Sequence, residues 1–214
     1  MVRAALLVAV AVSLAAPAAF AASQFEGTIE RIGPELRERM TGVSWRRGCP
    51  VHIRDLRVLT LSHWGFDREV HDGRLVVNRW QAQRMRRAVK KLFEARFPIR
   101  RMRLVDHYGA SDTRSMNANN TSAFNCRFVA GTTRWSNHAY GRAIDINPVQ
   151  NPYVRPDGTA SPAKGQPYVD CTQRRKGMIR AGGRVVRAFA SVGWEWGGYW
   201  TSPKDYQHFS SNGR

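Results

Sequence analysis

The chain has 214 residues, and 34 Lys and Arg against 16 Asp and Glu give it a formal net charge of +18 at pH 7. This length suits one domain with a sizeable hydrophobic core, and beyond the first residues no stretch is apolar enough to cross a bilayer. The positive charge attracts polyanions at long range, but charge alone does not choose among wall polymers, anionic lipid and nucleic acid.

The first 21 residues have the composition of a signal peptide. Arg3 precedes an apolar run over residues 4–14, and Ala19-Phe20-Ala21 fits the small-residue pattern of a cleavage site. The run is shorter than the roughly 20 apolar residues that a membrane-spanning helix needs. We therefore expect residues 1–21 to be removed and the mature protein to be secreted without a transmembrane anchor.

The first ordered segment is predicted to be a helix within residues 27–40. Its apolar residues recur at helical spacing: Ile29, Ile32, Leu36 and Met40. This spacing places them on one face of a helix, although Pro34 is expected to delay its start.

Strands are predicted next. Residues 56–64 are β-rich, and residues 70–75 are typical of a hairpin that turns at Asp72-Gly73. Asn78 is then expected to cap a helix that runs to Phe97, because Pro98 ends it. Its apolar stripe consists of Met85, Val89, Leu92 and Phe93. The other residues of this helix are mostly Arg and Lys, and we interpret them as a solvent-exposed face rather than as a nucleic-acid-binding surface.

The second half of the chain has less regular patterning. Residues 100–106 alternate basic and apolar side chains and predict a strand, and residues 143–147 predict another. The polar stretches 111–134 and 150–177 are predicted to be long loops, which are usually functional or disordered. A short helix is predicted over residues 184–192.

There is no repeat and no linker. We therefore predict one α+β domain with a small antiparallel sheet and flanking helices.

The three cysteines are Cys49, Cys126 and Cys171. In an oxidising compartment two of them are expected to pair, and no C-x2-C spacing indicates a zinc cluster. We predict a disulfide between Cys49 and Cys126, which lie beside predicted ordered elements. Cys171 lies in a polar stretch and is predicted to be free.

Residues 136–147 form the first block with the residue types of a catalytic site. His138 and Asp145 are seven positions apart, and Gly141 permits a turn between them. Asp145 stands between two isoleucines in a predicted strand, which is costly unless the carboxylate is paired or bound to a cation. An imidazole brought beside it makes a nitrogen–oxygen pair suited to zinc.

The second block consists of residues 194–200, which are rich in Trp and Gly, leading to residues 205–209. His208 completes a three-ligand set and leaves a fourth position open for water, as in catalytic zinc sites. Asp205, three residues earlier, is placed to reach that water without binding the metal. Zinc lowers the pKa of bound water to roughly 7, and a nearby carboxylate can accept its proton.

The two blocks together resemble a known family. The pattern Ser136-x-His138-x-x-Gly141-x-Ala143-x-Asp145, followed by Asp205-x-x-His208, is similar to the D-alanyl-D-alanine carboxypeptidase-like metallopeptidases. That family includes vancomycin-resistance dipeptidases and carboxypeptidases and phage L-alanyl-D-glutamate endopeptidases. The resemblance is strongest from about residue 103 to residue 209.

The resemblance implies one zinc ion per chain, held by His138, Asp145 and His208 at the sheet, with Asp205 as general base and acid. The family's dipeptidases have Glu in that last role, so Asp205 is closer to the endopeptidase branch. The resemblance also places Ser136 near the substrate and implies an upstream arginine that holds the scissile carbonyl. The best match is Arg114, and Arg127 is the second.

The resulting organisation is a signal peptide at 1–21, an N-terminal extension at 22–100 packed on the core, and a peptidase core at 101–214. The expected function is cleavage of peptidoglycan stem peptides, as a D-Ala-D-Ala carboxypeptidase or as an L-Ala-D-Glu-type endopeptidase. Anionic cell-wall polymers are expected partners by charge.

Two further classes of function compete with this one. The first is a non-catalytic zinc-containing wall-binding module, which has no need of Asp205. The second is a nucleic-acid-binding protein, but the chain has no recognisable reading motif and no interleaved aromatic platforms, so no specific nucleic acid is expected as a partner.

Overall fold

The computed structural model describes residues 24–213, so the predicted signal peptide lies outside the described residues. Within them the α-helices are α1 (Pro34–Met40), α2 (Ala82–Glu94), α3 (Asp112–Asn117) and α4 (Arg184–Ala190). The strands are β1 (Gly27–Arg31), β2 (Leu56–Trp64), β3 (Val70–Asn78), β4 (Ala143–Asp145), β5 (Tyr153–Val154), β6 (Ala160–Ser161), β7 (Glu195–Trp196), β8 (Lys204–Asp205) and β9 (His208–Ser210). The short 3₁₀ turns are η1 (Ile53–Asp55), η2 (Val105–Tyr108), η3 (Asn137–Tyr140), η4 (Ala163–Tyr168) and η5 (Gly197–Tyr199).

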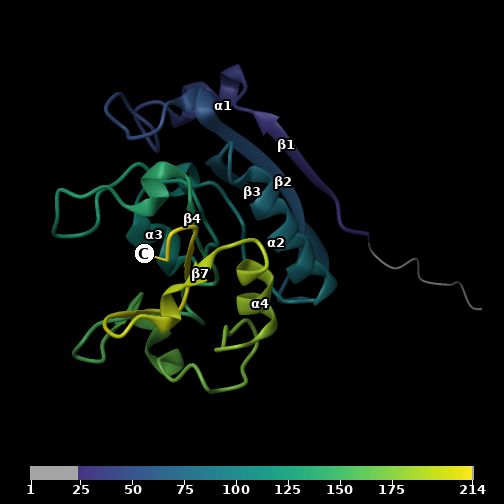
Figure 1. The fold of residues 1–214 in the computed structure, drawn as a ribbon, viewed down its shortest axis with the longest axis vertical. Coiled ribbons are helices and arrows are strands. Elements are labelled where there is room, and N and C mark those ends of the chain that lie inside the picture. The colour runs from purple at the N-terminus through teal and green to yellow at the C-terminus, as the bar shows by residue number, and fades with distance from the viewer. Residues whose placement is uncertain (1–23, 214) are drawn as a thin grey trace, which may run out of the picture.

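The α+β class predicted from the sequence is confirmed, with three small antiparallel sheets in place of one. Their strand orders are β1-β2-β3, β4-β9-β7 and β6-β5-β8. Helix α2 packs on β2, and α4 packs on α2 and β7, so the helices flank the sheets (Figure 1).

The β1-β2-β3 sheet is covered on both faces along its central strand, because successive β2 side chains alternate between two hydrophobic clusters. Leu59 and Leu61 belong to the main cluster, which also contains the buried stripe of α2 and the apolar residues of α4 and β9. Leu56 and Val58 belong to a smaller cluster on the other side, which includes α1 residues. The predicted strand at 56–64 and the predicted α2 stripe are therefore confirmed.

The helix predicted over residues 27–40 is wrong in its first half. Residues 27–31 form β1, which pairs with β2 in the register Thr28↔Thr60. The helix begins only at Pro34, in the first turn, where the missing amide hydrogen costs nothing. The edge of β2 offers these residues hydrogen-bond partners that the sequence spacing does not reveal.

The predicted turn at Asp72-Gly73 is also wrong. The chain reverses at residues 65–69, where Gly65 N donates to Glu69 O at 2.7 Å, and β3 runs through Asp72 and Gly73. Gly73 is instead required by close packing, because a Cβ there would lie 2.4 Å from the Met102 Cβ.

Asn78 does not cap α2. The N-cap is Gln81, and the Asn78 Oδ1 accepts from Trp80 N at 3.1 Å in a turn before the helix. The helix ends at Glu94, three residues earlier than predicted, and Phe97 N bonds Leu92 O just beyond it.

The predicted strand at 100–106 is a single bridge, between Met102 and Thr121, followed by η2. The predicted loop at 111–134 contains α3, which Ser111 caps by accepting from Arg114 N at 3.3 Å. Residues 119–126 of the same stretch are buried beside β4. The polar side chains there satisfy buried backbone groups, which explains a composition that otherwise resembles a surface loop.

The predicted loop at 150–177 is ordered by β5, β6 and η4. The predicted strand at 143–147 and helix at 184–192 are confirmed as β4 and α4, each two residues shorter at its C-terminal end.

The predicted disulfide is confirmed. Cys49 and Cys126 are bonded, with their Cα atoms 5.9 Å apart, and Cys171 is the free cysteine of the described residues. The bond lies at the smaller hydrophobic cluster, where it ties the segment after α1 to the segment before η3.

The main cluster contains residues from both sides of the predicted boundary at residue 100, so the N-terminal segment completes the core around the second sheet. The boundary itself stays a prediction. In the described part of the chain no helix combines the length and the apolar character needed to cross a membrane.

Candidate metal centre

The sheet β4-β9-β7 brings the two halves of the sequence pattern together. β4 and β9 are antiparallel, and their register places Asp145 directly opposite His208. The strands lie at the centre of the molecule, between α3 and α4 (Figure 1). Ile144 and Ile146 are buried as the strand prediction required, and Asp145 points to the other side.

His138 reaches the same place from η3. The Ser136 side chain caps this turn by accepting from His138 N at 3.3 Å. Gly141 ends the turn with φ = 63°, and a Cβ there would lie 2.5 Å from Asn78 N. The motif glycine therefore serves both the left-handed backbone and the close approach of β3.

Three donor atoms converge at this point. His138 Nε2 lies 3.2 Å from Asp145 Oδ2, His208 Nδ1 lies 3.0 Å from Asp145 Oδ1, and the two nitrogens are 3.3 Å apart. Ligands of a tetrahedral zinc ion are roughly 3.3 Å apart, given bonds of about 2.0–2.2 Å. All three side chains are at least nine-tenths buried, so the residues fit one divalent metal ion.

The ring of His138 is oriented by a backbone carbonyl. Its Nδ1 donates a hydrogen bond to Ala123 O, which leaves the lone pair of Nε2 directed toward Asp145 and His208. Ala123 lies in the buried stretch for which the sequence predicts a loop. No sequence signal identifies it, because the group involved is the main chain.

The carboxylate of Asp145 is held in its charged form. Burial by itself would raise the pKa of Asp145, but the imidazoles of His138 and His208 lower it below its ordinary value. A buried, ionised carboxylate beside two nitrogen donors is the environment that a cation stabilises.

Asp205 has the opposite behaviour. Burial raises the pKa of Asp205 to about 7, and the charge of Asp145 adds to this effect while the His208 imidazole opposes it. The side chain is half-buried, but its Oδ1 is shielded from solvent and has no hydrogen-bond partner among the described residues. A shielded carboxyl group that titrates near neutral pH is suited to proton transfer.

Gly197 belongs to the second block, but the sequence assigned it no role, and the structure shows that it shapes this corner of the site. A Cβ on Gly197 would lie 2.7 Å from Asp205 O, 3.0 Å from Asp205 Cβ and 3.3 Å from His208 Cβ. The first glycine of the Gly197-Gly198 pair therefore lets η5 approach both residues. The signal that could have identified its role is the glycine pair within the second block itself.

The two candidate substrate arginines lie in or against α3: Arg114 is part of the helix, and Arg127 contacts its first residue. Arg114 Nε donates to Tyr108 O at 2.9 Å, and Arg127 forms an ion pair with Asp112 at 2.9 Å. Arg127 also lies next to η3, because its carbonyl accepts from Ser136 N at 3.1 Å. The roles of Arg114, Arg127 and Ser136 toward a substrate stay predictions.

A second group of metal-binding residue types lies at the turn between β2 and β3: Asp67, Glu69 and His71. All three are exposed, and His71 Nε2 already bonds the Asp67 carboxylate at 2.9 Å. This pair stabilises the turn.

Residues 130–211 match the family model described as D-alanyl-D-alanine carboxypeptidase. This part of the chain is therefore similar to that peptidase family. The matched segment contains Ser136, His138, Asp145, Asp205 and His208, and the family supports a peptidase activity. It begins after Arg114 and Arg127, later than the limit near residue 103 drawn from the motif. No curated protein and no solved structure matched the chain.

Proposed function

We propose that the protein is a secreted, zinc-dependent peptidase that cleaves the stem peptide of peptidoglycan. The observation that supports this most strongly is the convergence of His138, Asp145 and His208 at the spacing of zinc ligands, with the partnerless Asp205 Oδ1 nearby in the described structure. Two nitrogens and one carboxylate are a donor set that zinc favours. Secretion is proposed on the composition of residues 1–21.

The residues of the chain divide the work as follows. A zinc ion bound here supplies a Lewis acid that polarises the scissile carbonyl and makes water more acidic. Asp205 accepts a proton from the attacking water and delivers it to the nitrogen of the leaving group. Its raised pKa suits both steps near neutral pH, because the group can gain and lose the proton at little cost.

Asp205 also favours a peptidase over the alternative function, a non-catalytic wall-binding module that binds zinc. A binding site gains nothing from a carboxyl group with one shielded oxygen that has no hydrogen-bond partner in the described structure, and burying such an oxygen costs stability. The substrate bond is either a terminal D-Ala-D-Ala bond or an L-Ala-D-Glu-type bond within the stem peptide.

The proposal is tested with purified protein beginning at residue 22, loaded with zinc and incubated with muropeptides of known structure. Mass spectrometry of the products should reveal one cleaved peptide bond, and a chelator should abolish the cleavage. Adding zinc back should restore it. Intact muropeptides after incubation with the loaded protein, or cleavage that survives complete metal removal, would contradict the proposal.

A further inference from the structure

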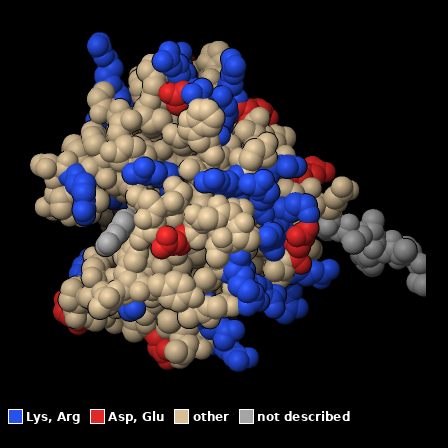
Figure 2. Space-filling view, in the orientation of Figure 1, with Lys and Arg blue, Asp and Glu red and all other residues tan. Residues whose placement is uncertain are grey.

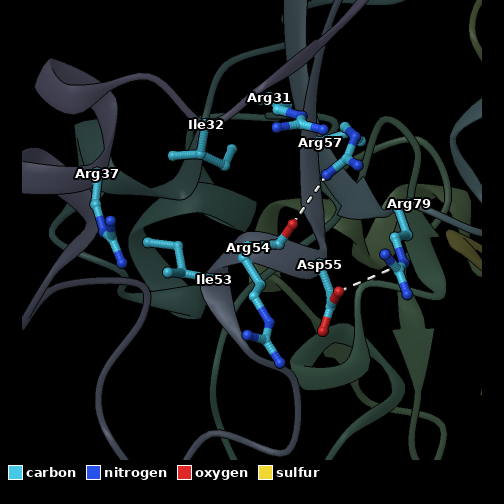
Figure 3. A pocket seen from close by; sticks show the side chains of 8 residues that line it. All are labelled: Arg31, Ile32, Arg37, Ile53, Arg54, Asp55, Arg57 and Arg79. Atoms are coloured by element: carbon cyan, nitrogen blue, oxygen red, sulfur yellow. Dashed lines mark hydrogen bonds and ion pairs between the residues drawn. The ribbon is translucent and has the colours of Figure 1, made fainter.

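A large cavity lies away from the metal centre, where α1, η1 and the neighbouring ends of β1 and β2 meet (Figure 3). Its volume is about 460 Å³. Five of its eight lining residues are arginines: Arg31, Arg37, Arg54, Arg57 and Arg79, with Ile32, Ile53 and Asp55. We call this cavity the arginine pocket. It shares no residue with the metal centre.

The one acidic residue that lines the pocket, Asp55, forms an ion pair with one of the five arginines. Asp55 Oδ1 lies 3.4 Å from Arg79 Nε, and the Arg79 guanidinium also stacks 4.5 Å from the centre of the Trp80 ring. Arg57 is fixed differently, because its Nη1 donates to the carbonyls of Leu56 at 2.8 Å and Arg54 at 3.0 Å. Two of the five guanidinium groups are thus held in place by the fold.

The other three have no such partner. No side-chain hydrogen bond or ion pair within residues 24–213 involves the guanidinium groups of Arg31, Arg37 or Arg54. Figure 3 shows the two isoleucines between Arg37 and the remaining arginines, and of these two Ile32 is partly exposed while Ile53 belongs to the buried core. With Arg57, four arginines of the pocket lack an acidic partner in the described structure, and grouping their charges around one cavity is unfavourable unless an anion neutralises them.

We propose that the arginine pocket binds a phosphodiester polymer and contacts more than one of its phosphate groups. Guanidinium groups match phosphate oxygens in two-pronged hydrogen bonds. The volume lies in the range of pockets that hold whole small molecules, about 300–1,000 Å³, and is larger than one phosphate ion requires. Four charges without an acidic partner likewise match several phosphates. The partly exposed side chain of Ile32 offers an apolar contact to the carbon backbone between the phosphates.

A nucleic acid fits the pocket less well. Single strands are held by stacking of their bases on aromatic side chains, and the lining has no aromatic residue. Trp80, next to Arg79, is exposed, but the guanidinium of Arg79 covers one face of its ring. The favoured ligand is therefore a phosphodiester polymer without bases, such as the glycerol phosphate chains of a cell wall. That choice of source rests on the proposed function, whereas the phosphate site does not.

The position of the pocket gives such binding a use. Arg79 follows Asn78, whose backbone N donates to Gly141 O at 2.8 Å at the end of the η3 turn that holds His138. Basic side chains also predominate over acidic ones on the face of the molecule shown in Figure 2. Binding at the arginine pocket would hold the protein on an anionic wall, with the metal centre close to its substrate.

The test is a binding measurement that is independent of peptide hydrolysis. A fluorescent glycerol phosphate oligomer is titrated with the full protein, and with the variant Arg37→Gln/Arg54→Gln. The matched control is Arg84→Gln/Arg87→Gln, which removes the same charge from the exposed face of α2. None of these four side chains forms an ion pair or side-chain hydrogen bond in the described structure, so both variants should fold.

We expect the pocket variant to bind the oligomer at least about tenfold more weakly, and the control to change affinity by less than about threefold. Equal losses in the two variants would overturn the proposal, because attraction would then depend on overall charge. Inorganic phosphate should compete only weakly. If inorganic phosphate competed as strongly as unlabelled oligomer, the pocket would bind a single phosphate group, and the proposal of a polymeric ligand would be overturned.

Titration with single-stranded DNA of the same charge as the oligomer tests whether the pocket prefers a nucleic acid. Weaker binding than that of the oligomer, or binding that the pocket variant leaves unchanged, supports the proposal. DNA binding at least as tight as that of the oligomer and lost in the same variant would overturn it. A protein that cleaves no muropeptide but binds the oligomer through the arginine pocket would contradict the proposed function alone.

Discussion

Asp145 Oδ1 lies 3.0 Å from His208 Nδ1, and the two residues face each other across the β4–β9 ladder. Two of the three candidate ligands are therefore positioned by a strand register, which a single-residue slip would destroy. His138 arrives from outside the sheet, on a turn that Ser136 and Gly141 shape. The site is rigid where the sheet supports it and depends on one short turn for its third donor.

The strongest test of the assigned roles compares Asp205 with His208. Asp205→Ala should keep close to one zinc per chain and lose about 10²–10⁴-fold in activity, because it removes a proton-transfer group. His208→Ala should lose both zinc and activity, because it removes a ligand. Elemental analysis and a muropeptide assay on the same preparations measure both. Loss of zinc from Asp205→Ala would mean that Asp205 is itself a ligand.

Gly197→Ala should damage the site without removing any functional group. The new Cβ would lie 2.7 Å from Asp205 O, so η5 and Asp205 must move apart. Displacements near 1 Å in an active site cost about 10²-fold in rate, so we expect at least a tenfold loss in kcat. Gly33→Ala is the control, since nothing lies within 4 Å of a Cβ at that position. Equal activity of the two variants would show that Asp205 tolerates the shift.

The disulfide should supply a large part of the stability of the fold. It closes a loop of 77 residues, which corresponds to about 4 kcal/mol on the chain-entropy model. Cys49→Ala/Cys126→Ala should therefore lower the free energy of unfolding by about that amount in urea denaturation. Cys171→Ala should change it little, because Cys171 forms no disulfide. An equal loss in Cys171→Ala would contradict this assignment.

His63 should make the fold sensitive to acid. Burial, with a smaller effect of the neighbouring His71, lowers the pKa of His63 to about 4. The unfolded chain, with a pKa near 6.5, then binds more protons than the folded protein between pH 6.5 and 4. Stability should therefore fall as the pH drops through this window, by up to about 3 kcal/mol.

This pH dependence is measured by urea denaturation of metal-free protein at pH 7 and at pH 4.5. His63→Gln should lose less stability between the two values than the parent, because it has no proton to gain at that position. Histidines at the metal centre are present in both proteins and cancel in the comparison. The same pH dependence in parent and variant would assign the acid sensitivity to other groups.

Local patterns in the sequence were enough wherever the interaction partners are close in the chain or the residue types are strongly constrained. The buried stripe of α2 and the strand at β2 follow from spacing alone. The residues His138, Asp145 and His208 could be selected because a buried carboxylate between two isoleucines needs a cation or a partner, and the glycine turn brings a histidine to it. Only the structure brings their donor atoms to 3.0–3.3 Å of one another.

Tertiary contacts decided the rest, because the same residues satisfy more than one local pattern. Ile29 fits a helical stripe, yet residues 27–31 form a strand because they hydrogen-bond to the edge of β2. Gly73 fits a turn, yet it serves the close approach of Met102. The arginine pocket joins residues from four separate segments between Arg31 and Arg79, and its concentration of charge exists only in the folded protein, where packing fixes which side chains share a cavity.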